Sequence, residues 1–165
     1  MKSLILPAIM LIVSIASAQR VIKIKRASDH STYVHGDKFE GVIFTKDYDS
    51  GAYINKRNKE FTPTINEIIL AEKLLYKNLD TINNKWASSV HKNLKTYLRQ
   101  YFGYINVNGE RIIYIYAFRK KDLPELRKQW LQNLIMVEDG GDNYWQIEIN
   151  LNTKKLLSFG INSVG

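Results

Sequence analysis

The chain has 165 residues, of which 45% are hydrophobic and 24% charged, a composition typical of a single globular domain and not of a disordered chain. Its formal net charge of +8 at pH 7 favours anionic partners. The chain has no cysteine, which excludes disulfide frameworks, thiolate metal sites, cysteine nucleophiles and lipid anchors on cysteine.

Residues 1–18 have the pattern of a signal peptide. Lys2 gives a positive start, the run from Leu4 to Ile15 is mostly apolar, and Ala16-Ser17-Ala18 supplies small residues for cleavage. A membrane-spanning helix needs about 20 apolar residues, and Gln19-Arg20 ends the run too early. We therefore expect cleavage after Ala18 and a basic, secreted or periplasmic mature protein without a membrane span.

Two short strands are predicted in the segment 19–61. Val21 to Lys25 and Phe39 to Phe44 are rich in β-branched and aromatic residues. The stretches 27–38 and 46–60 are polar, carry glycines and lack periodicity, so they are predicted to be loops. Residues 19–61 and 62–165 together are expected to form one domain.

Two helices are predicted next. Pro63 suits a first helical turn, and Thr64 and Glu67 have the spacing of a capping box. A second helix is predicted from about Lys85 to Tyr101, because apolar residues recur there mostly at steps of three and four. These residues are Trp86, Val90, Leu94, Tyr97, Leu98 and Tyr101.

Beyond Gly103 the hydrophobic period becomes alternating, which is typical of strands. Residues 104–107 and 110–118 are predicted to form a hairpin through Asn108-Gly109, whose residue types suit a type I′ turn. Further strands are predicted at 133–138, 144–150 and 156–161, which would complete an antiparallel meander.

The order of elements predicts an α+β fold in which two helices pack on one face of a curved antiparallel β-meander. Over roughly residues 62–165 this layout resembles cystatin-like and nuclear-transport-factor-like domains. Resemblance to the second group implies a pocket in the concave side of the sheet. The glutamine-valine-glycine and proline-tryptophan loops of inhibitory cystatins have no counterpart here, so the resemblance does not extend to protease inhibition.

Candidate catalytic and metal-binding groups are few, and each has a structural interpretation beside the functional one. His30 and His35 share a polar segment with two acids, but their spacing is irregular. Asp47 and Asp49 begin like a calcium loop that lacks its glycine and its final glutamate. The remaining candidates are His91 and the cluster Glu138, Asp139 and Asp142. Because no enzyme motif is present, we expect no catalytic residue, metal or cofactor.

Two candidate binding surfaces emerge. The interval from Asp80 to Glu110 contains no acid between its ends, and on the predicted second helix its basic residues fall on one face, opposite the apolar stripe. These are Lys85, Lys92, Lys95 and Arg99. Aromatic residues on the predicted strands could line a sheet pocket or form part of the core, and the candidates are Tyr114, Tyr116 and Trp145.

The favoured hypothesis is an exported, non-enzymatic binding domain that recognises an acidic protein or an anionic envelope or extracellular polymer, rather than nucleic acid. One alternative is a small hydrolase or lyase on a nuclear-transport-factor-like scaffold, acting through His91 or the carboxylates of Asp139 and Asp142. Another is a structural component of the cell envelope, for which an exposed strand edge would be the sign.

Overall fold

The computed structural model describes residues 20–50, 59–122, 129–137 and 139–162. The predicted signal peptide and its cleavage site lie outside these residues, as does Glu138. Among the helices in the described ranges, none has the length and apolar character needed to cross a membrane.

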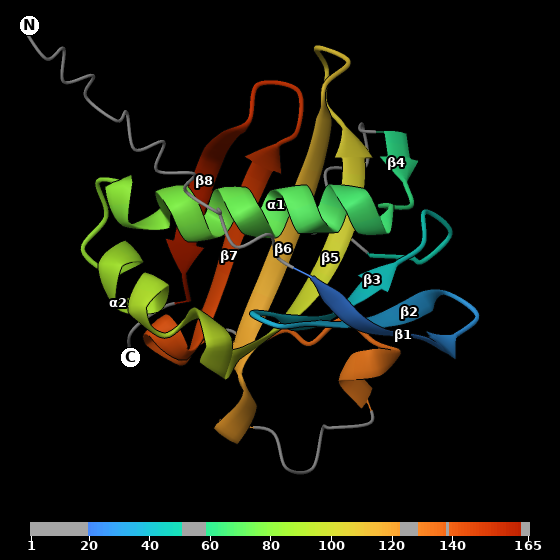
Figure 1. The fold of residues 1–165 in the computed structure, drawn as a ribbon, viewed down its shortest axis with the longest axis horizontal. Coiled ribbons are helices and arrows are strands. Elements are labelled where there is room, and N and C mark those ends of the chain that lie inside the picture. The colour runs from blue at the N-terminus through green and yellow to red at the C-terminus, as the bar shows by residue number, and fades with distance from the viewer. Residues whose placement is uncertain (1–19, 51–58, 123–128, 138, 163–165) are drawn as a thin grey trace, which may run out of the picture.

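One open sheet of eight strands organises the molecule (Figure 1). Its main path runs in the order β1-β2-β3-β5-β6-β7-β8, and β4 pairs with β5 off this path. The strands are β1 (Val21–Ser28), β2 (Ser31–Gly36), β3 (Glu40–Phe44), β4 (Lys59–Phe61), β5 (Tyr97–Ile105), β6 (Arg111–Arg119), β7 (Tyr144–Asn150) and β8 (Lys155–Ile161). The pairing of β3 with β5 is parallel and all the other pairings are antiparallel.

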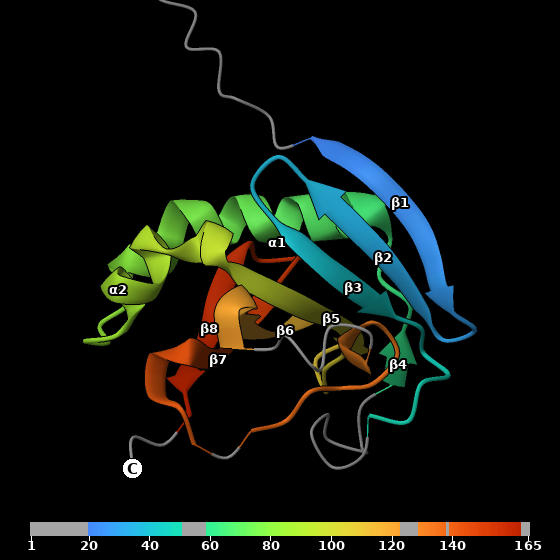
Figure 2. The same cartoon turned by 90° about the horizontal axis from the view of Figure 1, so that it is seen from below.

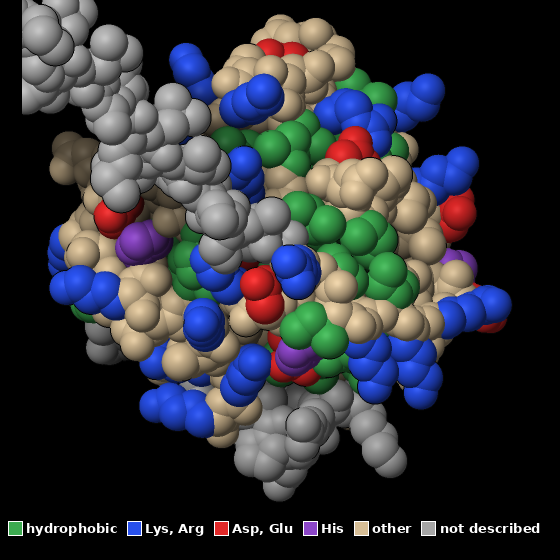
Figure 3. All heavy atoms as spheres, in the orientation of Figure 1, with side chains coloured by type: hydrophobic (Ala, Val, Ile, Leu, Met, Phe, Trp, Pro, Cys, Tyr) green, Lys and Arg blue, Asp and Glu red, His purple; other side chains and the backbone are tan. Residues whose placement is uncertain are grey.

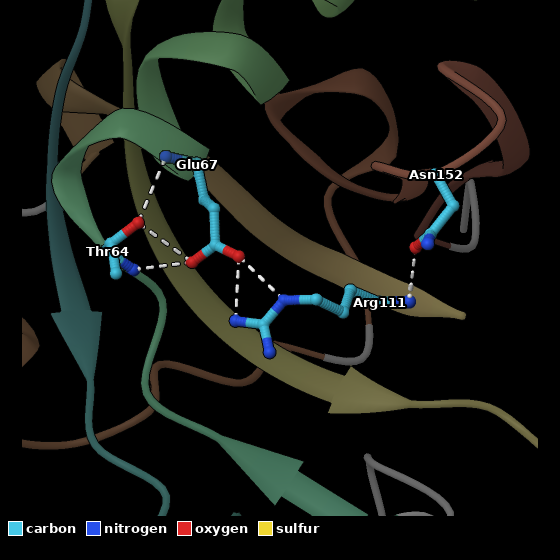
Figure 4. Close-up of polar contacts among 4 residues, drawn as sticks. All are labelled: Thr64, Glu67, Arg111 and Asn152. Atoms are coloured by element: carbon cyan, nitrogen blue, oxygen red, sulfur yellow. Dashed lines mark hydrogen bonds and ion pairs between the residues drawn. The ribbon is translucent and has the colours of Figure 1, made fainter. Parts of the chain in front are cut away.

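The first predicted helix is confirmed as α1 (Ile65–Asn78), which begins with the expected capping box. The backbone N–H of Glu67 donates to the Thr64 hydroxyl, and the backbone N–H of Thr64 donates to the Glu67 carboxylate. The other carboxylate oxygen of Glu67 lies 2.7 Å from Nη2 of Arg111 at the start of β6 (Figure 4). The backbone N–H of Arg111 in turn donates to the side chain of Asn152, so one cluster ties the helix start to the sheet and to the β7–β8 turn.

The second predicted helix is present but is much shorter than predicted. The segment contains a short helix, α2 (Ala87–Lys92), then a single 3₁₀ turn (Leu94–Thr96), and it enters the sheet as β5 at Tyr97. Every residue of β5 except Ile105 is buried. A strand covered on both faces has no polar–apolar alternation, and that is why its apolar residues could be mistaken for a helical stripe.

Each face of the sheet carries its own apolar cluster. On one face α1 lies across β5–β8 (Figures 1 and 2), and Ile68, Ala71 and Leu75 of this helix belong to the same buried cluster as Ile113, Ile147 and other sheet residues. Full burial of one such isoleucine or leucine side chain contributes about 1.5–3 kcal/mol. The helix and the sheet therefore stabilise each other.

The opposite face is covered by irregular chain. Residues 133–137, predicted as part of a strand, form none and instead pack under the sheet. The side chain of Gln100 on β5 holds this segment: its Nε2 donates to the carbonyls of Trp130 and Asn133, and its Oε1 accepts from the N–H of Ile135 at 2.8 Å. Its buried amide thus satisfies three backbone groups.

The predicted β5–β6 hairpin is present, but its turn is of a different type. Asn106 and Glu110 pair through their backbones, and Gly109 has a φ of +77°. Asn108 is not among the described residues with positive φ, so this is not a type I′ turn, which needs two such residues. The resulting architecture is α+β: a mostly antiparallel, open eight-stranded sheet with two described α-helices.

Candidate functional site

Of the four basic residues predicted to share a helical face, Arg99 is separated from the three lysines in the structure. Lys85, Lys92 and Lys95 are exposed around α2, whereas Arg99 lies on β5 and is fully buried. Lys85 rests over the Trp86 ring, and Lys92 and Lys95 line a small hollow of about 170 Å³. Because β5 is a strand, Arg99 belongs to the core rather than to a basic surface.

Arg99 forms an ion pair with Glu72 of α1, and both side chains are fully buried. Nε of Arg99 lies 2.8 Å from Oε1 of Glu72, but the alignment does not make a hydrogen bond. The Tyr101 hydroxyl donates to the same Oε1 at 2.9 Å, and the guanidinium also donates to the carbonyls of Leu94 and Tyr97. Within the described chain, Oε2 of Glu72 has no hydrogen-bond partner.

Burial and charge act in opposition in this cluster. Burial raises the pKa of Glu72 despite the attraction of Arg99 and the hydrogen bond from Tyr101. Burial alone would lower the pKa of Arg99, but the nearby Glu72 carboxylate raises it. Burial, followed by the charge of Glu72, raises the pKa of Tyr101 well above its ordinary value. Because Glu72 lies on α1 and Arg99 lies on β5, this buried ion pair links the helix to the sheet.

The predicted aromatic pocket is not assembled from its three residues. Trp145 pairs with Ala117 and lies in the helix-side cluster, whereas Tyr116 pairs with Gln146 and lies in the cluster on the opposite face. Trp145 is fully buried, Tyr116 is 1% exposed, and half-buried Tyr114 packs beside the same cluster as Tyr116. These rings therefore contribute to two cores on opposite faces and share no concavity.

Two of the candidate catalytic residues, His91 and Asp142, contact neighbouring groups of the fold. Nε2 of His91 is 2.8 Å from the carbonyl of Tyr76, and its Nδ1 is 3.8 Å from Asp80. Asp142 contacts Ser89 and Arg119. The described residues contain no group of three His, Asp or Glu side chains that could hold a metal ion.

A hollow beside β1 combines positive charge with a structured floor. It has a volume of about 280 Å³ and is lined by Lys23, Lys25, Arg26, Ala27, Tyr33 and Leu131, a set we call the basic hollow. Tyr33 packs edge-on against Trp130 with ring centroids 6.2 Å apart, and its hydroxyl donates to Glu40. The carbonyl of Leu131 accepts from the Ser31 hydroxyl. These contacts hold the floor in place.

The register of β1 and β2 places two lysines on the side of this hollow. Lys25 pairs with Tyr33 and Lys23 with His35, and cross-strand partners point to the same face of a sheet. Arg26 is paired with Asp29. Glu40, which accepts the hydrogen bond of Tyr33, lies 2.7 Å from Lys120. Burial would raise the pKa of Glu40, but the hydrogen bond and charge of Lys120 and the hydroxyl of Tyr33 lower it.

The nearby carboxylates of Asp29 and Glu40 pair with Arg26 and Lys120. Lys23 and Lys25 have no carboxylate partner in the described part of the chain. The strand at Val21–Lys25 was predicted from the sequence but this site was not, although the alternation of isoleucine and lysine in Ile22-Lys23-Ile24-Lys25 was a usable signal. It indicates a strand with one cationic face.

Comparisons with known proteins return no relative: no family model, no curated protein and no solved structure matches the chain. A function for the chain is therefore inferred from the geometry of the basic hollow.

Proposed function

We propose that the protein is an exported, non-enzymatic binding domain that recognises an acidic protein or an anionic envelope or extracellular polymer through the basic hollow. The observation that carries this proposal is the pair Lys23 and Lys25, which lie beside a structured aromatic floor without a carboxylate partner among the described residues. Two unpaired cations on one strand face attract an anion over about 10 Å at moderate salt.

We also propose that the protein is exported and that its fold is related to a known layout. The apolar start of the chain and Ala16-Ser17-Ala18 support cleavage after Ala18 and a secreted or periplasmic mature protein. The long helix α1 across the sheet supports a layout related to cystatin-like and nuclear-transport-factor-like domains. The anion-binding proposal does not depend on this relationship, because a fold by itself specifies no ligand.

The experiment is salt elution from a heparin matrix. Reversal of the charge at both site lysines, Lys23→Glu with Lys25→Glu, is expected to lower the eluting salt concentration markedly. The matched control is Lys73→Glu with Lys77→Glu, because both of these lysines are exposed on α1 and the change in net charge is the same. A third variant, Lys92→Glu with Lys95→Glu, tests the lysines around α2.

Binding through the basic hollow requires the first double variant to elute at a lower salt concentration than the other two. Equal elution of all three would mean that total charge alone governs retention, and the proposal would fail. Circular dichroism of each variant checks that the fold is kept, which is expected because all six lysines are exposed.

A further inference from the structure

The strand that carries Lys23 and Lys25 also forms an edge of the sheet. β1 is the first strand of the sheet path and pairs only with β2 among the described residues. Figure 2 shows it as the outermost strand on its side of the molecule. An edge strand has backbone N–H and C=O groups without ladder partners, and these can pair with a strand from another chain.

The open edge is regular over a short stretch. Register shifts occur between Val21 and Lys23 and between Arg26 and Ser28, so regular pairing with β2 runs from Lys23 to Arg26. All five residues from Ile22 to Arg26 are exposed. This stretch can accept an extended segment of about four residues, with main-chain hydrogen bonds along the strand.

The two faces of this edge differ in chemistry. Ile24 pairs with Val34, which belongs to the helix-side cluster, yet α1 leaves Ile24 54% exposed. Lys23 and Lys25 lie on the opposite face with Tyr33. In Figure 3, basic side chains gather where Figure 1 draws β1, and hydrophobic atoms lie between that strand and α1.

We infer that β1 binds an extended acidic segment of a partner protein as an added antiparallel strand. This inference rests on the proposed function and specifies its partner. Acidic side chains of the segment lie over Lys23 and Lys25, and the apolar side chains that alternate with them lie beside Ile24. A soluble anionic polymer has no apolar side chains or amide ladder with which to use that second face and the open edge.

A second copy of the same strand is a poor occupant. When two β1 strands pair antiparallel in one continuous sheet, each keeps its faces, so Lys23 and Lys25 of both copies meet on the same face. Like charges opposite one another destabilise a strand pair. Charge complementarity therefore selects an acidic partner.

The test uses synthetic peptides with blocked ends and a nuclear magnetic resonance titration of the folded protein. The probe alternates glutamate and valine over six residues, and the control has the same composition with three glutamates followed by three valines. We expect about tenfold tighter binding of the alternating peptide, because two charge pairs and one apolar pair form together. Amide exchange at outward-facing N–H groups of residues 22–26 should slow only with this peptide.

Two N-methylated versions of the alternating peptide provide a signature of strand pairing. Alternate residues of a strand direct their N–H groups to opposite edges. Methylation of the three valines or of the three glutamates thus blocks opposite edges, and one version should lose binding while the other retains it. Equal binding of both versions, or of the alternating and block peptides, would overturn the strand-pairing inference.

The failure of this inference is distinguishable from failure of the proposed function. If Lys23→Glu with Lys25→Glu still lowers heparin elution selectively but the peptides bind equally, the basic hollow binds anions without strand pairing. If that double variant changes neither heparin elution nor peptide affinity, the proposed function itself is wrong. The milder variant Lys23→Gln with Lys25→Gln gives the same readouts if the charge reversal disturbs the fold.

Discussion

Arg99 illustrates how one residue can hold two layers of the molecule together. Arg99 lies on β5, and its Nε is 2.8 Å from Oε1 of Glu72 on α1. Its guanidinium also donates to two backbone carbonyls. Both charged groups are fully buried. Removal of one member of such a pair leaves an uncompensated charge in the core, which costs more than the pair itself contributes.

The variant Arg99→Met is therefore expected to lower the free energy of unfolding by about 3–5 kcal/mol. Without Arg99, the carboxylate of Glu72 stays buried with a single hydrogen bond, from the Tyr101 hydroxyl. Urea unfolding followed by circular dichroism measures the change. The double variant Arg99→Met with Glu72→Gln removes both charges and keeps an oxygen for Tyr101, so it should be more stable than Arg99→Met alone. A double variant less stable than the single one would contradict this account.

At the scale of elements, the start of α1 combines a capping box with an ion pair on one carboxylate. Burial would raise the pKa of Glu67, but hydrogen bonds from Thr64 and the nearby Arg111 lower it below the ordinary 4.5. A lowered pKa means that the ionised carboxylate stabilises the fold. That stabilisation is present above pH 4.5 and is lost as the pH falls through the lowered pKa.

The variant Glu67→Gln should destabilise the protein by about 1–2 kcal/mol at neutral pH, since it removes a charged cap and a partly exposed ion pair. The difference from the parent protein should shrink at an acidic pH below the lowered pKa of Glu67, where the parent carboxyl is protonated as well. Urea unfolding at both pH values measures this. Arg111→Gln keeps the capping box and should retain part of the pH dependence. A gap of the same size at both pH values would disprove the role given to the carboxylate.

Elements fixed by local chemistry were predictable, and elements fixed by distant partners were not. The start of α1 was correct because Thr64 and Glu67 interact within one turn. β2 was predicted as a loop, since Ser31, Thr32, His35 and Gly36 give it a polar composition; it is a strand because β1 and β3 pair with it on both sides. For the same reason, β5 was predicted as part of a helix and Arg99 was predicted to be exposed, whereas it is buried.

For the molecule as a whole, the parallel contact between β3 and β5 joins the hairpins β1–β3 to the later strands. The chain between them contains β4, α1 and α2, so no local pattern announces this contact. The basic hollow depends on it too, because β1 and Leu131 come from opposite parts of the sequence. The sequence could therefore place Lys23 and Lys25 on a strand without showing what lies beside them.

One sheet shared by two apolar clusters should unfold as a single unit. Consecutive residues of β6, such as Ile115 and Tyr116, point to opposite faces and belong to different clusters. Loss of this strand therefore disrupts both. Trp145 reports on the helix side, where its ring packs against Tyr97 at 5.6 Å, and Trp130 reports on the other side, where its ring packs against Phe118 at 6.1 Å.

Two variants separate these reporters: Trp86→Phe with Trp130→Phe leaves Trp145, and Trp86→Phe with Trp145→Phe leaves Trp130. In each variant the urea midpoint from tryptophan fluorescence should coincide with the midpoint from far-ultraviolet circular dichroism, as two-state unfolding requires. The comparison is made within each variant, because replacement of a buried tryptophan shifts its overall stability. If Trp130 fluorescence changes at lower urea than the circular dichroism, the chain covering the face opposite α1 detaches before the sheet melts. The floor of the basic hollow would then be a separate unit, since Trp130 packs against Tyr33 and precedes Leu131.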